Sequence, residues 1–201
     1  MNKKLKIGIT GGIGSGKSVV SDIIESEGLI VLRADSIAKD MMLNDEKIKK
    51  KLIKAFSEES YEDGKPNTKF LAEKVFTSQD NIDKINAIIH PPVLKLIETK
   101  SNEQLKTSSL VFIESALIYE AKFHKMFDHV ILVCADKNIR IKRSISRDGR
   151  TENEVKRRME FQLKDEVKRE KASFVIDNNS SIEELKVRVT FILNLLRSMA
   201  S

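Results

Sequence analysis

The feature of this sequence that most constrains its fold is a cluster of glycines near the start. Four of the chain's eight glycines fall at positions 11, 12, 14 and 16, and Lys17 and Ser18 follow at once. An apolar, β-branched run precedes the cluster and an amphipathic helical pattern follows it. A strand, a glycine-rich turn and a helix that opens on Lys-Ser form the arrangement in which backbone N–H groups curl around phosphate oxygens. We therefore expect a parallel α/β sheet with a phosphate site at one edge.

Residues 11–18, the phosphate loop, predict the contacts of a bound nucleotide. Lys17 is expected to reach the β- and γ-phosphates and to act in catalysis, and the Ser18 hydroxyl is expected to bind Mg²⁺. A glycine-rich turn that merely starts a helix is the alternative, but it does not explain a lysine and a hydroxyl at these fixed offsets. The residues expected to bind ATP are Gly12, Ile13, Gly14, Ser15, Gly16, Lys17, Ser18 and Val19.

Short apolar runs alternate with helical patterns along the chain and predict five buried parallel strands, at residues 5–10, 29–32, 110–113, 129–134 and 174–176. The first helix, 17–27, should turn Val19, Val20, Ile23 and Ile24 inward and stop at Gly28. The last, 183–199, should pack on the sheet through Leu185, Val189, Ile192, Leu193 and Leu196. The predicted fold class is a three-layer α/β architecture.

Two stretches are too long to be simple crossovers. Residues 36–109 are helical and polar, with expected interruptions at 62–66 and at His90-Pro-Pro92, and predict an inserted helical lobe. Residues 136–172, the basic segment, predict a helical hairpin with a break at Asp148-Gly149, and such a hairpin could cover a site as a lid. The nucleotide core is then expected to comprise residues 1–35, 110–135 and 173–201.

The net charge of +6 is concentrated in the basic segment, since residues 137–171 hold 13 basic and 7 acidic side chains. A local anion-handling element is favoured over a polycationic surface. Arg143 and Arg147 are four residues apart and share a helix face, with Arg140 one turn earlier. Guanidinium groups placed in this way are expected to clamp the β- and γ-phosphates during catalysis. A solvated helix held by salt bridges is the alternative.

Two acidic residues follow predicted strands at the edge where ligands bind in parallel sheets. Asp35 comes after the second strand and is the candidate general base for an acceptor hydroxyl; its alternative role is to cap a helix that starts at Ser36. Glu114 ends the third strand, where it could lie near Mg²⁺ or pair with an arginine of the basic segment.

Taken together, these residues resemble the dephospho-CoA kinase family, over nearly the whole chain. The match includes residues 9–18, Ala34-Asp35, Val75-Phe76, Ile89-His90-Pro91, residues 117–120, Arg143, Arg147-Asp148, Gln162 and residues 175–178. The resemblance implies a P-loop kinase fold with a nucleotide core, a helical lobe for the acceptor and a helical lid, and it implies that Asp35 is the catalytic base. It also places His90, Lys69, Asp35 and Glu114 among the residues that bind the substrate. The alternative for His90 is a histidine that ends a helix before Pro91.

Several positions depart from the family pattern. Arg33 replaces the first aspartate of Asp-Ala-Asp, Val19 a hydroxyl residue, Lys69 an arginine and Arg140 a glutamine, while Ala116 stands in for a proline. None of these changes removes Lys17, Ser18 or Asp35. Arg33 is expected to lower the pKa of the base or to contact an acceptor phosphate.

The resemblance implies transfer of the ATP γ-phosphoryl group to the ribose 3'-hydroxyl of dephospho-CoA, with Mg²⁺ as cofactor. ATP and dephospho-CoA would be the partners, with no nucleic acid, no membrane and no obligate protein partner. A lone Cys134 excludes an internal disulfide and is expected to be a small buried side chain. No run is apolar enough to cross a bilayer and no signal-peptide pattern is present, so the expected location is the cytoplasm.

Three rival functions are less favoured by the sequence. A kinase for another small hydroxyl acceptor would use the same core, and the helical lobe would make the difference. A nucleotide-switched regulator lacks the Asn-Lys-x-Asp pattern, because Asp136-Lys137-Asn138 has the wrong order. A nucleic-acid binder would need aromatic side chains among the basic ones, and only 5% of residues are aromatic.

Overall fold

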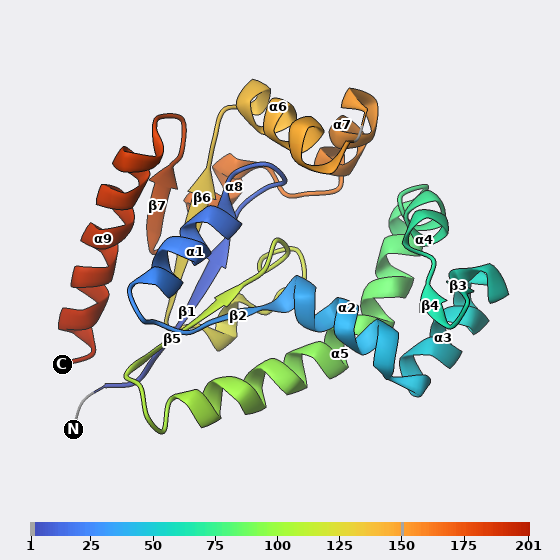
Figure 1. Cartoon of the computed structure of the whole chain (residues 1–201), viewed down its shortest axis with the longest axis horizontal. Coiled ribbons are helices and arrows are strands. Elements are labelled where there is room, and N and C mark those ends of the chain that lie inside the picture. Colours follow the sequence, from blue (N-terminus) through green and yellow to red (C-terminus); the bar gives the residue numbers. More distant parts are fainter. Residues whose placement is uncertain (1–2, 150) are drawn as a thin grey trace. The chain divides into compact units, whose positions relative to one another are not determined.

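The computed structural model describes residues 3–149 and 151–201. A five-stranded, wholly parallel sheet forms the centre of one compact unit, with strand order β2-β5-β1-β6-β7 (Figure 1). Its strands are β1 (Leu5–Thr10), β2 (Val31–Arg33), β5 (Leu110–Glu114), β6 (His129–Cys134) and β7 (Phe174–Asp177). The sheet confirms the predicted fold class; the second strand starts two residues later than predicted.

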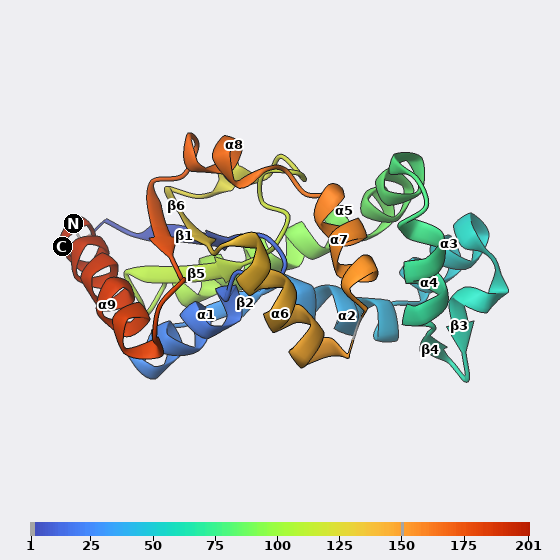
Figure 2. The same cartoon turned by 90° about the horizontal axis from the view of Figure 1, so that it is seen from above.

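The helices of this unit are α1 (Lys17–Ser26), α6 (Lys137–Asp148), α7 (Glu152–Glu160), α8 (Asp165–Arg169) and α9 (Ile182–Met199), with a 3-10 turn η2 (His124–Met126). Helices α1 and α9 pack together on one face of the sheet, and α8 lies along β6 on the other (Figure 2). Helix α6 ends at Asp148 and is followed by Gly149, which is left-handed at φ 64°. Helix α7 begins at Glu152, after a capping box formed by Thr151 and Glu154. The predicted break at this place is confirmed.

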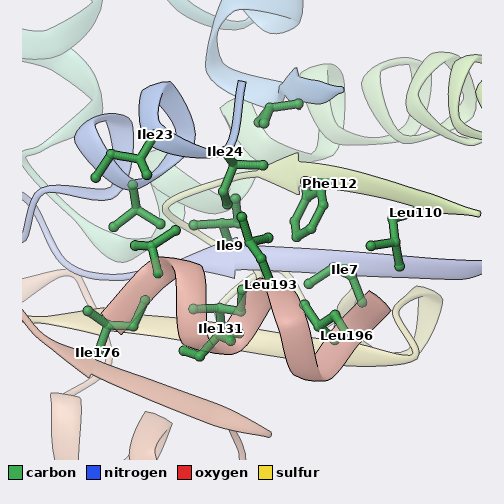
Figure 3. Close-up of a cluster of buried hydrophobic side chains, with 14 of the residues drawn as sticks. Ile7, Ile9, Ile23, Ile24, Leu110, Phe112, Ile131, Ile176, Leu193 and Leu196 are labelled. Carbon is green, nitrogen blue, oxygen red and sulfur yellow. The ribbon is translucent and has the colours of Figure 1, made fainter. Parts of the chain in front are cut away.

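The hydrophobic core lies between the sheet and helices α1 and α9 (Figure 3). In the central strands, apolar residues do not alternate with polar ones and buried residues do not alternate with exposed ones, because both faces of a parallel sheet are covered. The five residues predicted on the inner face of α9 are all buried, and Cys134 is buried as expected. The prediction for Val19 was wrong: its side chain is 39% exposed, because it lies about 100° around α1 from Val20 and falls outside the apolar stripe that meets the sheet.

Residues Ala34–Glu98 form a second compact unit. It contains α2 (Ala34–Asn44), α3 (Glu46–Phe56), a 3-10 turn η1 (Glu58–Ser60), the hairpin β3 (Tyr61–Glu62) with β4 (Lys65–Pro66), α4 (Thr68–Val75) and most of α5 (Gln79–Gln104). The interruption predicted at residues 62–66 is this hairpin, whose turn places Asp63 and Gly64 at positive φ.

The interruption predicted at His90-Pro-Pro92 was wrong, because α5 runs through Pro91 and Pro92 without ending. Proline removes a backbone donor and crowds the carbonyl one turn earlier, at a cost of roughly 3 kcal/mol. Ile89, Val93 and Ile97 follow one another at four-residue spacing and are all buried. Keeping this continuous apolar stripe in the core offsets the cost of the prolines.

Candidate active site

The phosphate loop leaves the carboxyl end of β1, the middle strand of the sheet, and leads directly into α1. The N-cap residue of α1 is Gly16, which has no side chain with which to cap the first N–H groups of the helix. These donors, together with the positive end of the helix dipole, make an anion site. Lys17 is the first residue of this helix and is half-buried.

Two loop glycines are required by their surroundings. Gly14 and Gly16 have φ of 74° and 97°, in the left-handed region that side chains rarely adopt. A Cβ on Gly14 would lie 2.2 Å from the carbonyl oxygen of Arg140, and one on Gly16 would lie 2.2 Å from Asn178 Nδ2. The loop is therefore closely packed against α6 and the end of β7, so its shape is fixed by neighbours as well as by glycine.

Side chains far away in the sequence hold the loop through its backbone. The N–H of Ile13 donates to Gln162 Oε1 (2.9 Å), and its carbonyl accepts from Arg140 Nε (2.9 Å). Asn178, which is buried, donates from Nδ2 to the Ser15 carbonyl (2.9 Å). The sequence analysis did not expect these three contacts with the loop backbone, and no spacing rule could have found contacts that join residues more than 120 positions apart.

Beside the loop, Ser18, Glu114 and Arg33 form a row of side chains in contact with one another. Ser18 Oγ donates to Glu114 Oε1 (3.2 Å), and Glu114 Oε2 lies 3.6 Å from Arg33 Nη1. Glu114 is buried, and its Oε2 has no hydrogen-bond partner among the described residues. The structure thus brings together the serine and the carboxylate that the sequence analysis named.

Arg33 is occupied by carboxylates of its own unit. Its Nη2 lies 2.6 Å from Asp22 and 2.6 Å from Glu25, both on α1, in addition to the Glu114 contact. Burial alone would lower the pKa of Arg33, but the hydrogen bonds that Arg33 donates to Asp22 and Glu25, with the charges of Glu25 and Glu114, outweigh burial and raise the pKa. A permanent positive charge therefore stands beside Glu114.

Arg143 and Arg147 both project from α6, about one helical turn apart. Arg143 Nη1 donates to the carbonyl of Asn178 (3.0 Å) and lies 3.9 Å from where a Cβ on Gly16 would be, so it is beside the loop. Arg147 is exposed and pairs with Asp148 (2.8 Å). The hydrogen bonds that Arg147 donates to Asp148 raise the pKa of Arg147, and the charges of Asp148 and Glu114 add to the effect.

The remaining candidates lie in the helical unit. Helix α2 starts at Ala34, so Asp35 is an exposed residue of its first turn, two positions after the capping position at residue 33. Lys69 is exposed in the first turn of α4, and His90 is half-buried in α5. Burial lowers the pKa of His90, so this imidazole is neutral over a wider pH range than a free one.

The fold and the loop with its lysine, serine, carboxylate and arginines define a P-loop kinase. The sequence matches the model of the dephospho-CoA kinase family over residues 5–184. The chain therefore belongs to the dephospho-CoA kinase family, whose members are ATP-dependent phosphotransferases.

Individual relatives agree with this assignment. Dephospho-CoA kinase of Corynebacterium glutamicum is 34% identical over 90% of this chain and 92% of its own, and that of Bacteroides fragilis is 37% identical over 87% and 85%. A crystal structure of a Thermus thermophilus protein superposes with a TM-score of 0.82 at 31% identity, covering 96% of this chain and 98% of that one. Dephospho-CoA kinase from Campylobacter jejuni shares the fold, with a TM-score of 0.69 at 24% identity over 96% and 97%.

Proposed function

We propose that this chain transfers the γ-phosphoryl group of ATP to the ribose 3'-hydroxyl of dephospho-CoA, the last step of coenzyme A synthesis. The observation that carries the proposal is the held phosphate loop beside Ser18 and Glu114, in a chain that belongs to the dephospho-CoA kinase family. ATP would bind along Gly12 to Val19, with its phosphates on the loop amides and Lys17 at the β- and γ-phosphates. Val19 offers only its backbone amide to the nucleotide.

The residues beside the loop fit a magnesium ion. Mg²⁺ prefers oxygen ligands and is usually held by one or two protein oxygens together with phosphates and water. The Ser18 hydroxyl and the buried Glu114 carboxylate, whose Oε2 accepts no hydrogen bond among the described residues, supply two such oxygens. No group of three or more His, Cys, Asp or Glu side chains suited to a metal occurs within the described ranges, which agrees with an ion that is largely bound by nucleotide. Bound Mg²⁺ would neutralise charge on the phosphates.

Asp35 is proposed as the general base, orienting the acceptor hydroxyl and accepting its proton. Its exposure in the first turn of α2 leaves the carboxylate accessible to a substrate. Arg143 and Arg147 would stabilise negative charge as the phosphoryl group moves, because guanidinium groups bind phosphate oxygens bidentately. The proposed lid, residues 136–172, would exclude water and so suppress hydrolysis.

The acceptor is proposed to bind through the helical lobe, residues 36–109, with His90 and Lys69 among its contacts. Lys69 offers an exposed ammonium group to a phosphate, and the neutral imidazole of His90 can donate and accept hydrogen bonds. No helix of the described chain is long and apolar enough to cross a bilayer. The proposed location is the cytoplasm.

A coupled assay of ADP release tests the proposal. MgATP is offered with dephospho-CoA, with a panel of nucleosides, or with no acceptor. We expect ADP release only with dephospho-CoA. Release with a nucleoside instead would keep the kinase chemistry and reject this acceptor, and release that is equal without any acceptor would reject the transfer reaction.

A further inference from the structure

The tip of the phosphate loop is held from outside by the basic segment. Gln162 accepts the N–H of Ile13, and Arg140 donates to the Ile13 carbonyl, each at 2.9 Å. The N–H belongs to the peptide group that joins Gly12 to Ile13, and the carbonyl belongs to the next one, which joins Ile13 to Gly14. Two consecutive peptide planes of the loop are therefore fixed by side chains.

The glycines on both sides of Ile13 make these two contacts important for the shape of the loop. Glycine places few limits on φ and ψ, so a peptide plane beside it can rotate unless something holds it. An inward-turned carbonyl would point a negative dipole at phosphate oxygens, whereas an inward-turned N–H attracts them. Arg140 keeps the Ile13 carbonyl occupied, and Gln162 uses the Ile13 N–H, so phosphate binding falls to the amides that follow.

Gln162 and Arg140 are themselves firmly anchored. The N–H of Leu163, the neighbour of Gln162, donates to Glu120 Oε1 (3.0 Å), and the same oxygen lies 2.6 Å from Nζ of the fully buried Lys168. Arg140 also pairs with Asp165 (2.9 Å), a pair in which both side chains are mostly buried. The α7–α8 turn is thus attached to the loop between β5 and β6 and to α6, which limits how far Gln162 can move.

We propose that Gln162 and Arg140 are positioning residues for the reaction, which hold the peptide planes around Ile13 in the orientation that binds ATP. Both act through the Ile13 backbone. The inference rests on the proposed binding of ATP phosphates at the loop. It assigns to the basic segment a role in shaping the loop before any nucleotide arrives, in addition to the proposed lid closure.

The first test is Gln162→Met in the full-length enzyme, a change that keeps the length of the side chain and removes the acceptor. We expect the Kd for ATP, titrated without acceptor, to rise about 5- to 10-fold, the factor that one net hydrogen bond is worth. The KM for dephospho-CoA should stay within about twofold. Lys156→Met is the matched control, because Lys156 is an exposed residue of α7 whose ion pair is with Glu152, and it should leave both constants unchanged.

The second test removes the other contact, with Arg140→Met, and then both together. Each single change should weaken ATP binding. Since either change lets the same loop tip relax, the double variant should lose less than the product of the two single factors. A thermal melt of each variant separates a change in loop geometry from general unfolding.

Three outcomes would overturn the inference. The first is unchanged ATP affinity in Gln162→Met while the wild type binds ATP, a result that leaves the proposed function intact. The second is a double variant whose loss equals the product of the single losses. The third is parallel loss of ATP and dephospho-CoA affinity with a fall in Tm, which would indicate general damage. A wild type that does not bind ATP would overturn the proposed function as well.

Discussion

At the scale of single residues, the carboxylates of the site share one positively charged partner. Arg33 faces three carboxylates, those of Asp22, Glu25 and Glu114. The sequence analysis expected Arg33 to act on Asp35 or on an acceptor phosphate. In the structure its guanidinium lies beside Glu114, the carboxylate that accepts a hydrogen bond from Ser18. Arg33 would thereby compete with the proposed magnesium ion for the oxygens of Glu114.

Arg33→Gln is therefore expected to lower the concentration of free Mg²⁺ that gives half-maximal activity. One partly exposed ion pair is worth up to about 1 kcal/mol, so the shift should be about 2- to 5-fold. Rates at fixed ATP, and the Mg²⁺ dependence of Tm with bound ATP, would both report it. Arg197→Gln, an exposed arginine that pairs with Glu27, should show no shift. A higher Mg²⁺ requirement in Arg33→Gln would contradict this account.

Asp35→Asn should keep ATP affinity and lose turnover by about 10²- to 10⁴-fold, because the amide cannot accept the proton of the acceptor hydroxyl. Steady-state kcat and a separate ATP titration give the two quantities. Asp40→Asn changes another exposed aspartate of α2 and should behave like the wild type. Nearly normal turnover in Asp35→Asn would mean that this residue is not the base.

His90 predicts an acid sensitivity of folding. Burial lowers its pKa below the ordinary value of 6.5. Below about pH 6.5, the imidazole is therefore protonated more fully in the unfolded chain than in the folded chain. The free energy of unfolding should therefore fall as the pH drops from about 6.5, and His90→Gln should flatten that slope in urea titrations. Above about pH 7.5 both curves should run parallel. An equal acid slope in the variant would exclude this histidine as the cause.

At the scale of elements, the phosphate loop is built by its own glycines and by neighbours that pack on it. Gly16→Ala should abolish measurable ATP binding, because the added Cβ meets Asn178 Nδ2 at 2.2 Å in a left-handed conformation. Gly28→Ala is the matched control, since Gly28 is also left-handed, at φ 77°, but has nothing within 4 Å of the added Cβ. It should cost roughly 1–2 kcal/mol of stability and leave ATP binding intact. Equal ATP binding by both variants would contradict the steric argument.

The same elements show what sequence reasoning can reach. The loop, the five strands and the stripe of α9 were predictable, because apolar periodicity and glycine placement are local signals. The passage of α5 through Pro91 and Pro92 was not, since burial of a longer apolar stripe decided it. The contacts of Gln162 and Asn178 with the loop were also out of reach, because they depend on how distant segments pack.

At the scale of the whole molecule, the excess of positive charge lies in one segment of the chain. Outside residues 137–171 the chain holds 23 basic and 23 acidic side chains, so the basic segment carries all of the excess. In the structure this segment supplies Arg143 beside Gly16 and the two side chains that hold Ile13. A polyphosphate bound at the loop would meet this local charge and would be steered toward it.

A single-turnover experiment with γ-labelled ATP tests the central claim most directly. Enzyme in excess over the labelled ATP is mixed with MgATP and dephospho-CoA, and the label is followed into the separated products. The account predicts that the label appears in coenzyme A as a 3'-phosphate, with little label in free phosphate. Label that appears only as inorganic phosphate, at a rate indifferent to dephospho-CoA, would contradict it.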